Sequence, residues 1–338
     1  EGGEDMGEHP IAWYHEYDGG RSFYTALGHT KESYSEPAFL QHVLGGIQYV
    51  MGDGTLDYDR ETIIPEPSRF EKVVLDYYLD EPMELEMLPD GRLLFNERHG
   101  RINIYDPAAG RTSLLTEVEV YSQQEDGLLG MALDPNYEDN NWIYLFQSHP
   151  TEWEQHIMRY DLDPDATEPL SNPKLLLRIP VQRKECCHAA GSLEFGPNGH
   201  LFISTGDDTN PFTSDGYGPI DERPGRAAWD AQRSSANTND LRGKILRIKP
   251  EPDGTYSIPD GNLFPKDGSQ GHPAIYVMGC RNPFRTSIDQ RTGYLYWGDV
   301  GPDANEDHES RGLMGHDEVN QARKAGFFGW PYFVGNNK

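Results

Sequence analysis

A strand, a tight turn containing glycine and a second strand recur along this chain from about residue 56 onward. Three copies span 87–95, 193–203 and 287–297, and a version with a longer turn runs from 131 to 146. Repeated antiparallel units of about 40 to 50 residues are typical of β-propeller blades, because each blade buries its faces only against its neighbours. The pattern therefore predicts a mainly β fold of the propeller type, with a β-sandwich carrying long loops as the alternative.

Four such units are fewer than a closed ring usually has, and the aromatic-rich run 329–338 is typical of a protein interior. We therefore expect about four blades here and further blades elsewhere. The third unit contains a large insertion, 206–240, which is rich in Asp, Gly, Pro, Ser and Asn. Long loops of this kind are usually functional or disordered, and propellers place them over the central channel, so we favour a functional role.

Residues 1 to about 52 follow a different pattern. A turn at 18–20 and a strand-like run 21–27 suggest a hairpin. A helix with its cap and first turn at 35–37 should follow, because apolar residues then recur at helical spacing up to Met51. Two adjacent glycines, Gly45 and Gly46, weaken that helix by about 1 kcal/mol each relative to alanine, so packing must hold it.

Composition excludes several classes of function. Acidic residues outnumber basic ones by 56 to 29, and the net charge of −27 would repel a nucleic acid backbone. No apolar run reaches the roughly 18 to 20 residues that a membrane-spanning helix needs. The sequence starts at Glu1 without a signal peptide pattern, and we expect it to be an internal stretch of a larger polypeptide.

Three cysteines cannot form a disulfide framework of the small secreted kind. Cys186 and Cys187 are adjacent, and they form either a vicinal disulfide or two buried thiols. His188 follows directly, just ahead of a predicted first strand of a blade. A neutral imidazole at this rim could take a proton from a substrate hydroxyl. The alternative is a histidine that only hydrogen-bonds a loop.

Two further segments carry candidate chemistry. Arg281 follows the apolar strand 274–278, and Pro283 favours an extended backbone at Asn282, so we expect a strand exit that projects Arg281 outward. Its guanidinium suits an anion or a developing oxyanion, and the alternative is an ordinary salt bridge. The acidic loop 298–307 offers carboxylates and carbonyls, which suits either a calcium site or a solvated loop.

Six segments, taken together and in this order, resemble the glucose/sorbosone dehydrogenase family. They are 125–135, 185–193, 243–248, 281–283, 298–303 and 329–331. The resemblance implies a six-bladed propeller similar to soluble quinoprotein glucose dehydrogenases, which use pyrroloquinoline quinone (PQQ) and Ca²⁺. The N-terminal segments 9–13 and 23–29 resemble the C-terminal end of ThuA-like, trehalose-utilisation domains.

This resemblance implies two parts, a partial ThuA-like α/β domain at 1–55 and a quinoprotein propeller at 56–338 whose C-terminal blades are missing. The implied function is PQQ-dependent oxidation of a sugar hydroxyl by hydride transfer, with a non-catalytic carbohydrate- or protein-binding propeller as the alternative. The implied partners are a small sugar, an electron acceptor such as a cytochrome, and the remainder of the polypeptide. The implied location is periplasmic or extracellular.

The resemblance also implies a role for individual residues. His188 would be the general base, and Arg281 would stabilise negative charge on the quinone oxygen. The implied cofactor neighbours are Arg281, Asn282, Cys186 and Cys187; the implied calcium ligands are Gly301, Pro302 and Asp303; the implied substrate neighbours are Glu125 and Asp126.

Two departures from the family pattern stand out. Cys187 occupies the place of an acidic residue that precedes the family's histidine, so the partner that orients His188 is missing or replaced. The basic residues that hold the cofactor carboxylates in the family would lie beyond Lys338.

Overall fold

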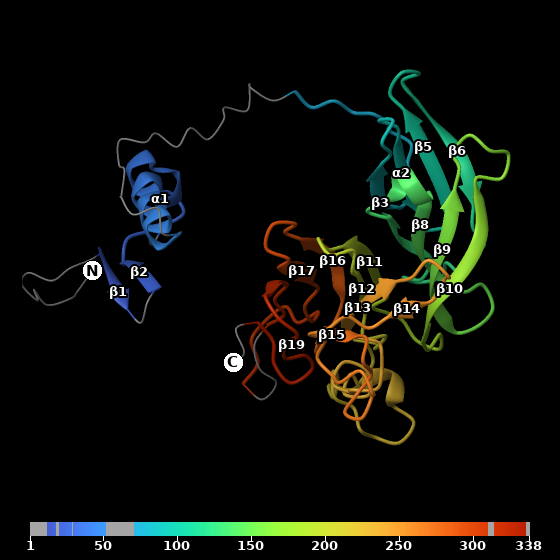
Figure 1. Cartoon of the computed structure of the whole chain (residues 1–338). Helices are drawn as coiled ribbons and strands as arrows, with labels where there is room; N and C mark the ends of the chain where they lie inside the picture. Colours follow the sequence, from blue (N-terminus) through green and yellow to red (C-terminus); the bar gives the residue numbers. More distant parts are fainter. Residues whose placement is uncertain (1–11, 18–19, 29, 52–70, 310–313, 336–338) are drawn as a thin grey trace, which may run out of the picture. The chain divides into compact units, whose positions relative to one another are not determined.

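The computed structural model describes residues 12–17, 20–28, 30–51, 71–309 and 314–335 (Figure 1). The chain divides into two compact units, Glu1–Val73 and Val74–Lys338. The domain boundary that we expected at residue 55 lies outside the described residues and stays a prediction. No helix of the described residues is both long and apolar enough to cross a membrane.

The first unit contains the predicted hairpin and helix. Strands β1 (Ala12–Tyr17) and β2 (Gly20–Thr25) pair antiparallel, and a 3-10 turn, η1 (Ser33–Ser35), precedes helix α1 (Pro37–Met51). Residues 18 and 19 of the predicted turn lie outside the described part. Helix α1 packs on β2, and a Cβ at Gly46 would collide with the ring of Phe23. Glycine is therefore required for this close packing, which holds the helix as expected.

The second unit consists of four β-sheets (Figure 1). The first sheet holds β3 (Pro82–Met87), β4 (Leu93–Glu97), β5 (Arg101–Asp106) and β6 (Arg111–Glu117). The second holds β7 (Leu128–Leu133), β8 (Trp142–Ser148), β9 (Glu154–Leu162) and β10 (Leu170–Pro180), with the short helix α2 (Tyr137–Asn140) between β7 and β8.

The third sheet is the largest. It holds β11 (Ala190–Phe195), β12 (Leu201–Thr205), β13 (Lys244–Pro250), β15 (Ile275–Met278) and β19 (Gly326–Phe327), with β14 (Tyr256–Ser257) paired to β13. The fourth holds β16 (Pro283–Ile288), β17 (Leu295–Asp299) and β18 (Glu318–Ala322). Within these sheets only β15 and β19 pair parallel among the described residues.

The first strands of the four sheets, β3, β7, β11 and β16, contact one another in that order. This arrangement is that of consecutive propeller blades around a common axis, so the predicted mainly β propeller with four blades is confirmed. The four predicted hairpins are β3–β4, β7–β8, β11–β12 and β16–β17. Gly91, Gly199 and Gly293 in three of these turns have positive φ, which explains the glycine in the repeat.

The hydrophobic core lies between neighbouring sheets rather than in one centre. Buried side chains such as Leu94 and Met131 join the first and second sheets, and Phe146 and Leu246 join the second and third. The predicted insertion joins β12 to β13, contains only the short 3-10 turn η3 (Ala227–Trp229), and is described throughout. The ends of the first strands and this insertion form the rim where the candidate residues lie.

Candidate functional site

His188 lies immediately before β11, and its side chain is buried. Its φ of 66° falls in the left-handed region, which few non-glycine residues adopt and which is often found at functional sites. The carboxylate of Glu125 accepts hydrogen bonds from the backbone N–H of His188 at 2.6 Å and of Ala189 at 3.3 Å. Glu125, from the loop before β7, thus holds the unusual backbone that presents the imidazole.

The ring of His188 is oriented by Asp207. Nδ1 of His188 lies 2.6 Å from Oδ1 of Asp207, whose side chain is completely buried. The same carboxylate accepts hydrogen bonds from Thr209 N at 2.9 Å and from Trp330 Nε1 at 2.7 Å. A carboxylate on Nδ1 places the ring proton there and leaves Nε2 with its lone pair. Within the described residues Nε2 has no hydrogen-bond partner, so it is the atom available to a substrate.

Asp207 is a functional candidate that the sequence analysis missed. We looked for the orienting acid beside His188 and found Cys187 in that place; Asp207, 19 residues further along, supplies it. The predicted hairpin β11–β12 could have pointed to Asp207, because its register pairs Ala190 with Thr205. The residues just before β11 and just after β12 therefore emerge at the same end of the sheet.

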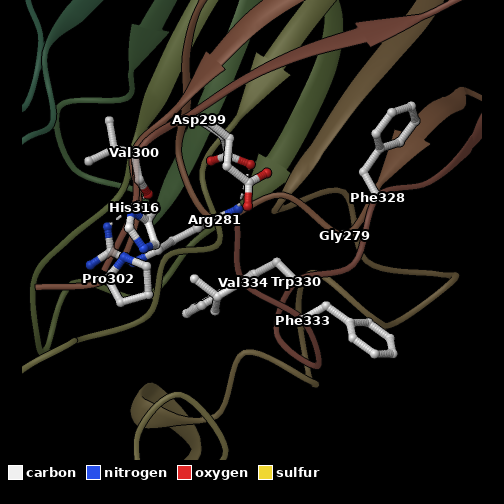
Figure 2. Close-up of a pocket in the computed structure, with 12 residues that line it drawn as sticks. Gly279, Arg281, Asp299, Val300, Pro302, His316, Phe328, Trp330, Phe333 and Val334 are labelled. Atoms are coloured by element: carbon white, nitrogen blue, oxygen red, sulfur yellow. Dashed lines mark hydrogen bonds between the residues drawn. The ribbon is translucent and has the colours of Figure 1, made fainter. Parts of the chain in front are cut away.

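Arg281, which follows β15, is buried, so the expectation that it projects outward was wrong. Its guanidinium instead donates to Val300 O at 3.0 Å (Figure 2). It also donates to Asp303 Oδ2 at 2.9 Å, and the carboxylate offsets its charge. The backbone N–H groups of Arg281 and Asn282 both donate to the carboxylate of Asp299. Burial raises the pKa of Asp299 to about 7 although these two hydrogen bonds act in the opposite direction.

Trp330 connects Asp207, the partner of His188, with Arg281. Its indole N–H binds Asp207, and its ring centroid lies 5.9 Å from the guanidinium carbon of Arg281. The backbone N–H of Asp207 also donates to the carbonyl of Arg281 at 2.8 Å. His188 and Arg281, which are 93 positions apart in the sequence, thus belong to one set of directly connected residues. The structure brings them to the same rim.

The loop that resembles a calcium site lies beside Arg281. Gly301 N donates to Asp317 Oδ1 at 2.9 Å, and Pro302 O accepts a hydrogen bond from Ala304 N at 2.9 Å. The third predicted ligand, Asp303, is paired with Arg281. In the described ranges no three His, Cys, Asp or Glu side chains gather to hold a metal. A cation at this loop would therefore depend mainly on backbone carbonyls.

A small pocket beside Gly301 and Pro302 shows whether this loop has room for a cation. Its lining includes Arg281, Asp299, Gly301, Pro302, Glu318 and Trp330, and its volume is about 20 Å³ (Figure 2). This is room for one water molecule or one bare ion, not for an organic cofactor. Oδ1 of Asn282, next to this pocket in sequence, is buried without a hydrogen-bond partner. The backbone carbonyls and the carboxylates of Asp299 and Glu318 in this lining are oxygen ligands of the kind that Ca²⁺ prefers.

The remaining predicted residues lie around His188. Cys186 and Cys187 are joined by a disulfide, which decides between the two alternatives left by the sequence. Asp126 accepts a hydrogen bond from Ser148 Oγ at 2.6 Å and lies 3.8 Å from Arg183 Nε, so its carboxylate has partners within the protein. Burial raises the pKa of Asp126. The predicted contact of Glu125 and Asp126 with a substrate stays a prediction.

Comparison with known families assigns both parts of the chain. The profile of the glucose / sorbosone dehydrogenase family matches residues 79–337, and that of the trehalose utilisation (ThuA) family matches residues 2–50.

Among curated proteins, an uncharacterized protein of Synechocystis is 28% identical over 264 residues, covering 75% of this chain and 57% of its own length. Quinoprotein glucose dehydrogenase B of Acinetobacter calcoaceticus is 28% identical over 283 residues, covering 79% and 53%. The HIPL1 protein of Arabidopsis thaliana is 28% identical over 268 residues, covering 64% and 34%. The chain thus spans between about a third and three fifths of the length of these relatives.

Two solved structures share the propeller. The PQQ-bound aldose sugar dehydrogenase of Streptomyces coelicolor is 28% identical with a TM-score of 0.58, and the match covers 77% of this chain and 65% of that one. A putative oxidoreductase (glucose dehydrogenase) of Thermus thermophilus is 30% identical with a TM-score of 0.59, and the match covers 76% and 67%.

Proposed function

Since the chain belongs to the glucose/sorbosone dehydrogenase family, we propose that its propeller, completed by further blades, oxidises a sugar hydroxyl with PQQ and Ca²⁺. The observation that carries this proposal is the buried pair of His188 and Asp207, connected through Trp330 to Arg281. It provides, at one rim, a base for the hydroxyl proton and a cation that can stabilise the negative charge that a hydride acceptor gains.

His188 acts as the base in this proposal. Its Nδ1 proton is held by Asp207, so Nε2 takes the proton of the sugar hydroxyl, and the carboxylate stabilises the imidazolium that forms. The hydroxyl oxygen then forms a carbonyl as the neighbouring carbon gives up its hydride. Glu125 keeps the imidazole in place through the backbone of His188, and burial of the His188 and Asp207 side chains excludes water from Nδ1.

When bound, PQQ supplies the carbonyl carbon that accepts the hydride. Arg281 would supply the fixed positive charge that stabilises the reduced cofactor, and its contacts with Val300 and Asp303 hold it so that it does not have to reorganise during the reaction. The carbonyls of Gly301 and Pro302, together with Asp303, would hold Ca²⁺, and Asn282 would contact the cofactor. The Cys186–Cys187 disulfide would offer an apolar surface next to His188.

A second function is favoured by one observation. The relatives at 24% identity include the Hedgehog-interacting proteins of mouse and human, whose name describes binding to another protein. A propeller that binds a ligand without turning it over is therefore the alternative. A periplasmic or extracellular location and a cytochrome-like electron acceptor remain predictions.

Reconstitution distinguishes the two functions. The full-length protein, supplied with PQQ and Ca²⁺, should reduce an artificial electron acceptor when glucose is added, and removal of Ca²⁺ with a chelator should stop the reaction. His188→Ala should lower kcat by about 10²- to 10⁴-fold and leave PQQ binding, followed by fluorescence, largely intact. A well-folded protein that binds PQQ but oxidises none of a panel of aldoses would overturn the dehydrogenase proposal.

A further inference from the structure

A cleft on the described part of the propeller unit has a volume of about 720 Å³. Three segments form it: the β8–β9 connection with Trp153, the stretch 182–185 that precedes the disulfide, and the insertion between β12 and β13. This volume lies within the roughly 300 to 1,000 Å³ typical of small-molecule sites. Apart from Asp207, none of its lining residues has a role in the mechanism proposed above.

The cleft adjoins a small pocket that His188 lines, since Gln182, Glu185 and Asp208 belong to the lining of both. Asp207 contributes to its wall, and the next two residues, Asp208 and Thr209, continue that wall. The backbone N–H of Asp208 also donates to the carbonyl of His188 at 3.3 Å. A molecule whose reacting group lies at His188 can therefore extend into this space.

The charges that line the cleft nearly cancel, although the chain as a whole carries −27. Three basic side chains stand against four acidic ones: Lys184, Arg233 and Arg242 against Glu185, Asp207, Asp208 and Asp230. Several already pair within the wall, as Arg242 does with Asp208 at 2.8 Å and Arg233 with Asp230 at 3.4 Å. A surface of this kind attracts neither polyanions nor polycations, and it suits a neutral ligand with many hydrogen-bonding groups.

The wall is preorganised by buried contacts. Arg242 bridges Asp208 and Asp240, and Gln182 donates to the carboxylate of Asp208 from both its backbone and its side chain. Lys244 is completely buried, and its Nζ donates to three carbonyls of the insertion, at 2.7, 2.8 and 3.1 Å. A long loop held in this way loses little conformational entropy when a ligand binds.

Two tryptophans are among the lining residues of the cleft. Trp153 is 46% exposed, so its ring is accessible to a ligand. Trp229 is largely buried beneath the guanidinium of Arg226, which is 3.6 Å from its ring centroid. An amphipathic ring that is rigid and exposed offers the apolar C–H face of a pyranose a stacking surface, while the surrounding polar groups bind hydroxyls.

From these features we infer that the cleft is a subsite for the second and third rings of an oligosaccharide whose terminal ring lies at His188. This inference rests on the proposed function and specifies its preferred substrates as oligosaccharides, with glucose as a more weakly bound substrate. Trp153 is the specificity-determining residue, because it is the more exposed of the two tryptophans in the lining and has no role in the proposed mechanism.

Titration calorimetry on the full-length protein without added quinone tests the subsite by binding alone. The probes are glucose, maltotriose and cellotriose. At least one trisaccharide should bind more tightly than glucose, and Trp153→Ala should weaken that binding by roughly three- to tenfold without changing the affinity for glucose. Phe212→Ala is the matched control, since Phe212 is an exposed aromatic residue of the same insertion outside the lining, and it should change neither affinity.

A second variant tests whether Trp153→Ala weakens trisaccharide binding only by disturbing the surrounding structure. Ala227→Trp places bulk in the cleft at an exposed position and should also weaken trisaccharide binding. The inference is overturned if both trisaccharides bind no more tightly than glucose, or if folded Trp153→Ala binds them like the wild type. Failure of the proposed function looks different, because trisaccharide binding would then persist in a protein that oxidises no sugar.

Discussion

Nδ1 of His188, which precedes β11, and Oδ1 of Asp207, which follows β12, lie 2.6 Å apart at the shared end of these antiparallel strands. The contact depends on the hairpin that joins these strands and on the insertion that begins immediately after β12. The imidazole is therefore oriented by the blade itself and not by the residue next to it in the sequence.

Asp207→Asn tests this orientation. The amide removes the negative charge and can present an N–H to Nδ1, which favours the tautomer with its proton on Nε2 and so disables the base. We expect kcat with glucose to fall by about 10²- to 10⁴-fold, with PQQ affinity nearly unchanged. Steady-state kinetics and fluorescence titration measure the two effects. Asp161→Asn on strand β9 is the control and should keep wild-type activity; equal losses in both variants would refute the role of Asp207.

Trp330→Phe tests the link between Asp207 and Arg281. Phenylalanine keeps an aromatic ring but removes the N–H that Asp207 accepts, which should cost about 1–3 kcal/mol of unfolding free energy. Trp297→Phe is a matched control, because Trp297 is also buried but its Nε1 has no hydrogen-bond partner among the described residues. Thermal melting should show the larger loss for Trp330→Phe. A loss of equal size in the two variants would mean that packing alone explains Trp330.

Much of the fold could be predicted from the sequence because the repeat is local. A strand, a turn with positive-φ glycine and a second strand are specified within about ten residues, so the four hairpins follow directly from the pattern. The parallel pairing of β15 with β19 could not be predicted, since it joins residues about 50 positions apart and β19 has only two residues.

In the candidate site, too, local motifs could be predicted and long-range contacts could not. His188 and Arg281 could be named from short motifs, whereas Asp207 and Trp330 act through long-range contacts that only the folded chain reveals. The burial of Arg281 was missed for a related reason. Its partners Val300 and Asp303 come from the next blade, and local sequence gives no measure of how completely they cover it.

The first strands of two sheets, β3 and β11, carry acidic residues that make the free energy of unfolding depend on pH. Glu194 on β11 has its pKa raised to about 7 by burial and, to a smaller extent, by the charge of Glu84 on β3. Burial likewise raises the pKa of Glu86 to about 7, and the charges of Glu194 and Glu84 add to this shift. The basic group in this cluster is Arg285, 3.9 Å from Glu84. At neutral pH the folded state therefore holds partly desolvated, mutually repelling carboxylates.

The sign of the effect follows from linkage. Below about pH 4.5 both the folded and the unfolded states are protonated at Glu194, while between about pH 4.5 and 7 the folded state binds more protons than the unfolded chain. The favourable contribution is thus full at low pH and is lost as the pH rises through about 7. Glu194→Gln should raise the unfolding free energy at pH 7.5 by about 1–2 kcal/mol, a value discounted for partial exposure, and should have little effect at pH 4.5.

Thermal or urea unfolding of the wild type and Glu194→Gln across pH 4.5 to 8 measures this difference. Glu117→Gln, on the exposed outer strand β6, is the control and should follow the wild-type curve throughout. Other carboxylates also titrate in this range, so the informative quantity is the difference between each variant and the wild type at the same pH. A Glu194→Gln curve that runs parallel to the wild type from pH 4.5 to 8 would show that Glu194 is ionised in the folded protein as freely as in the unfolded chain.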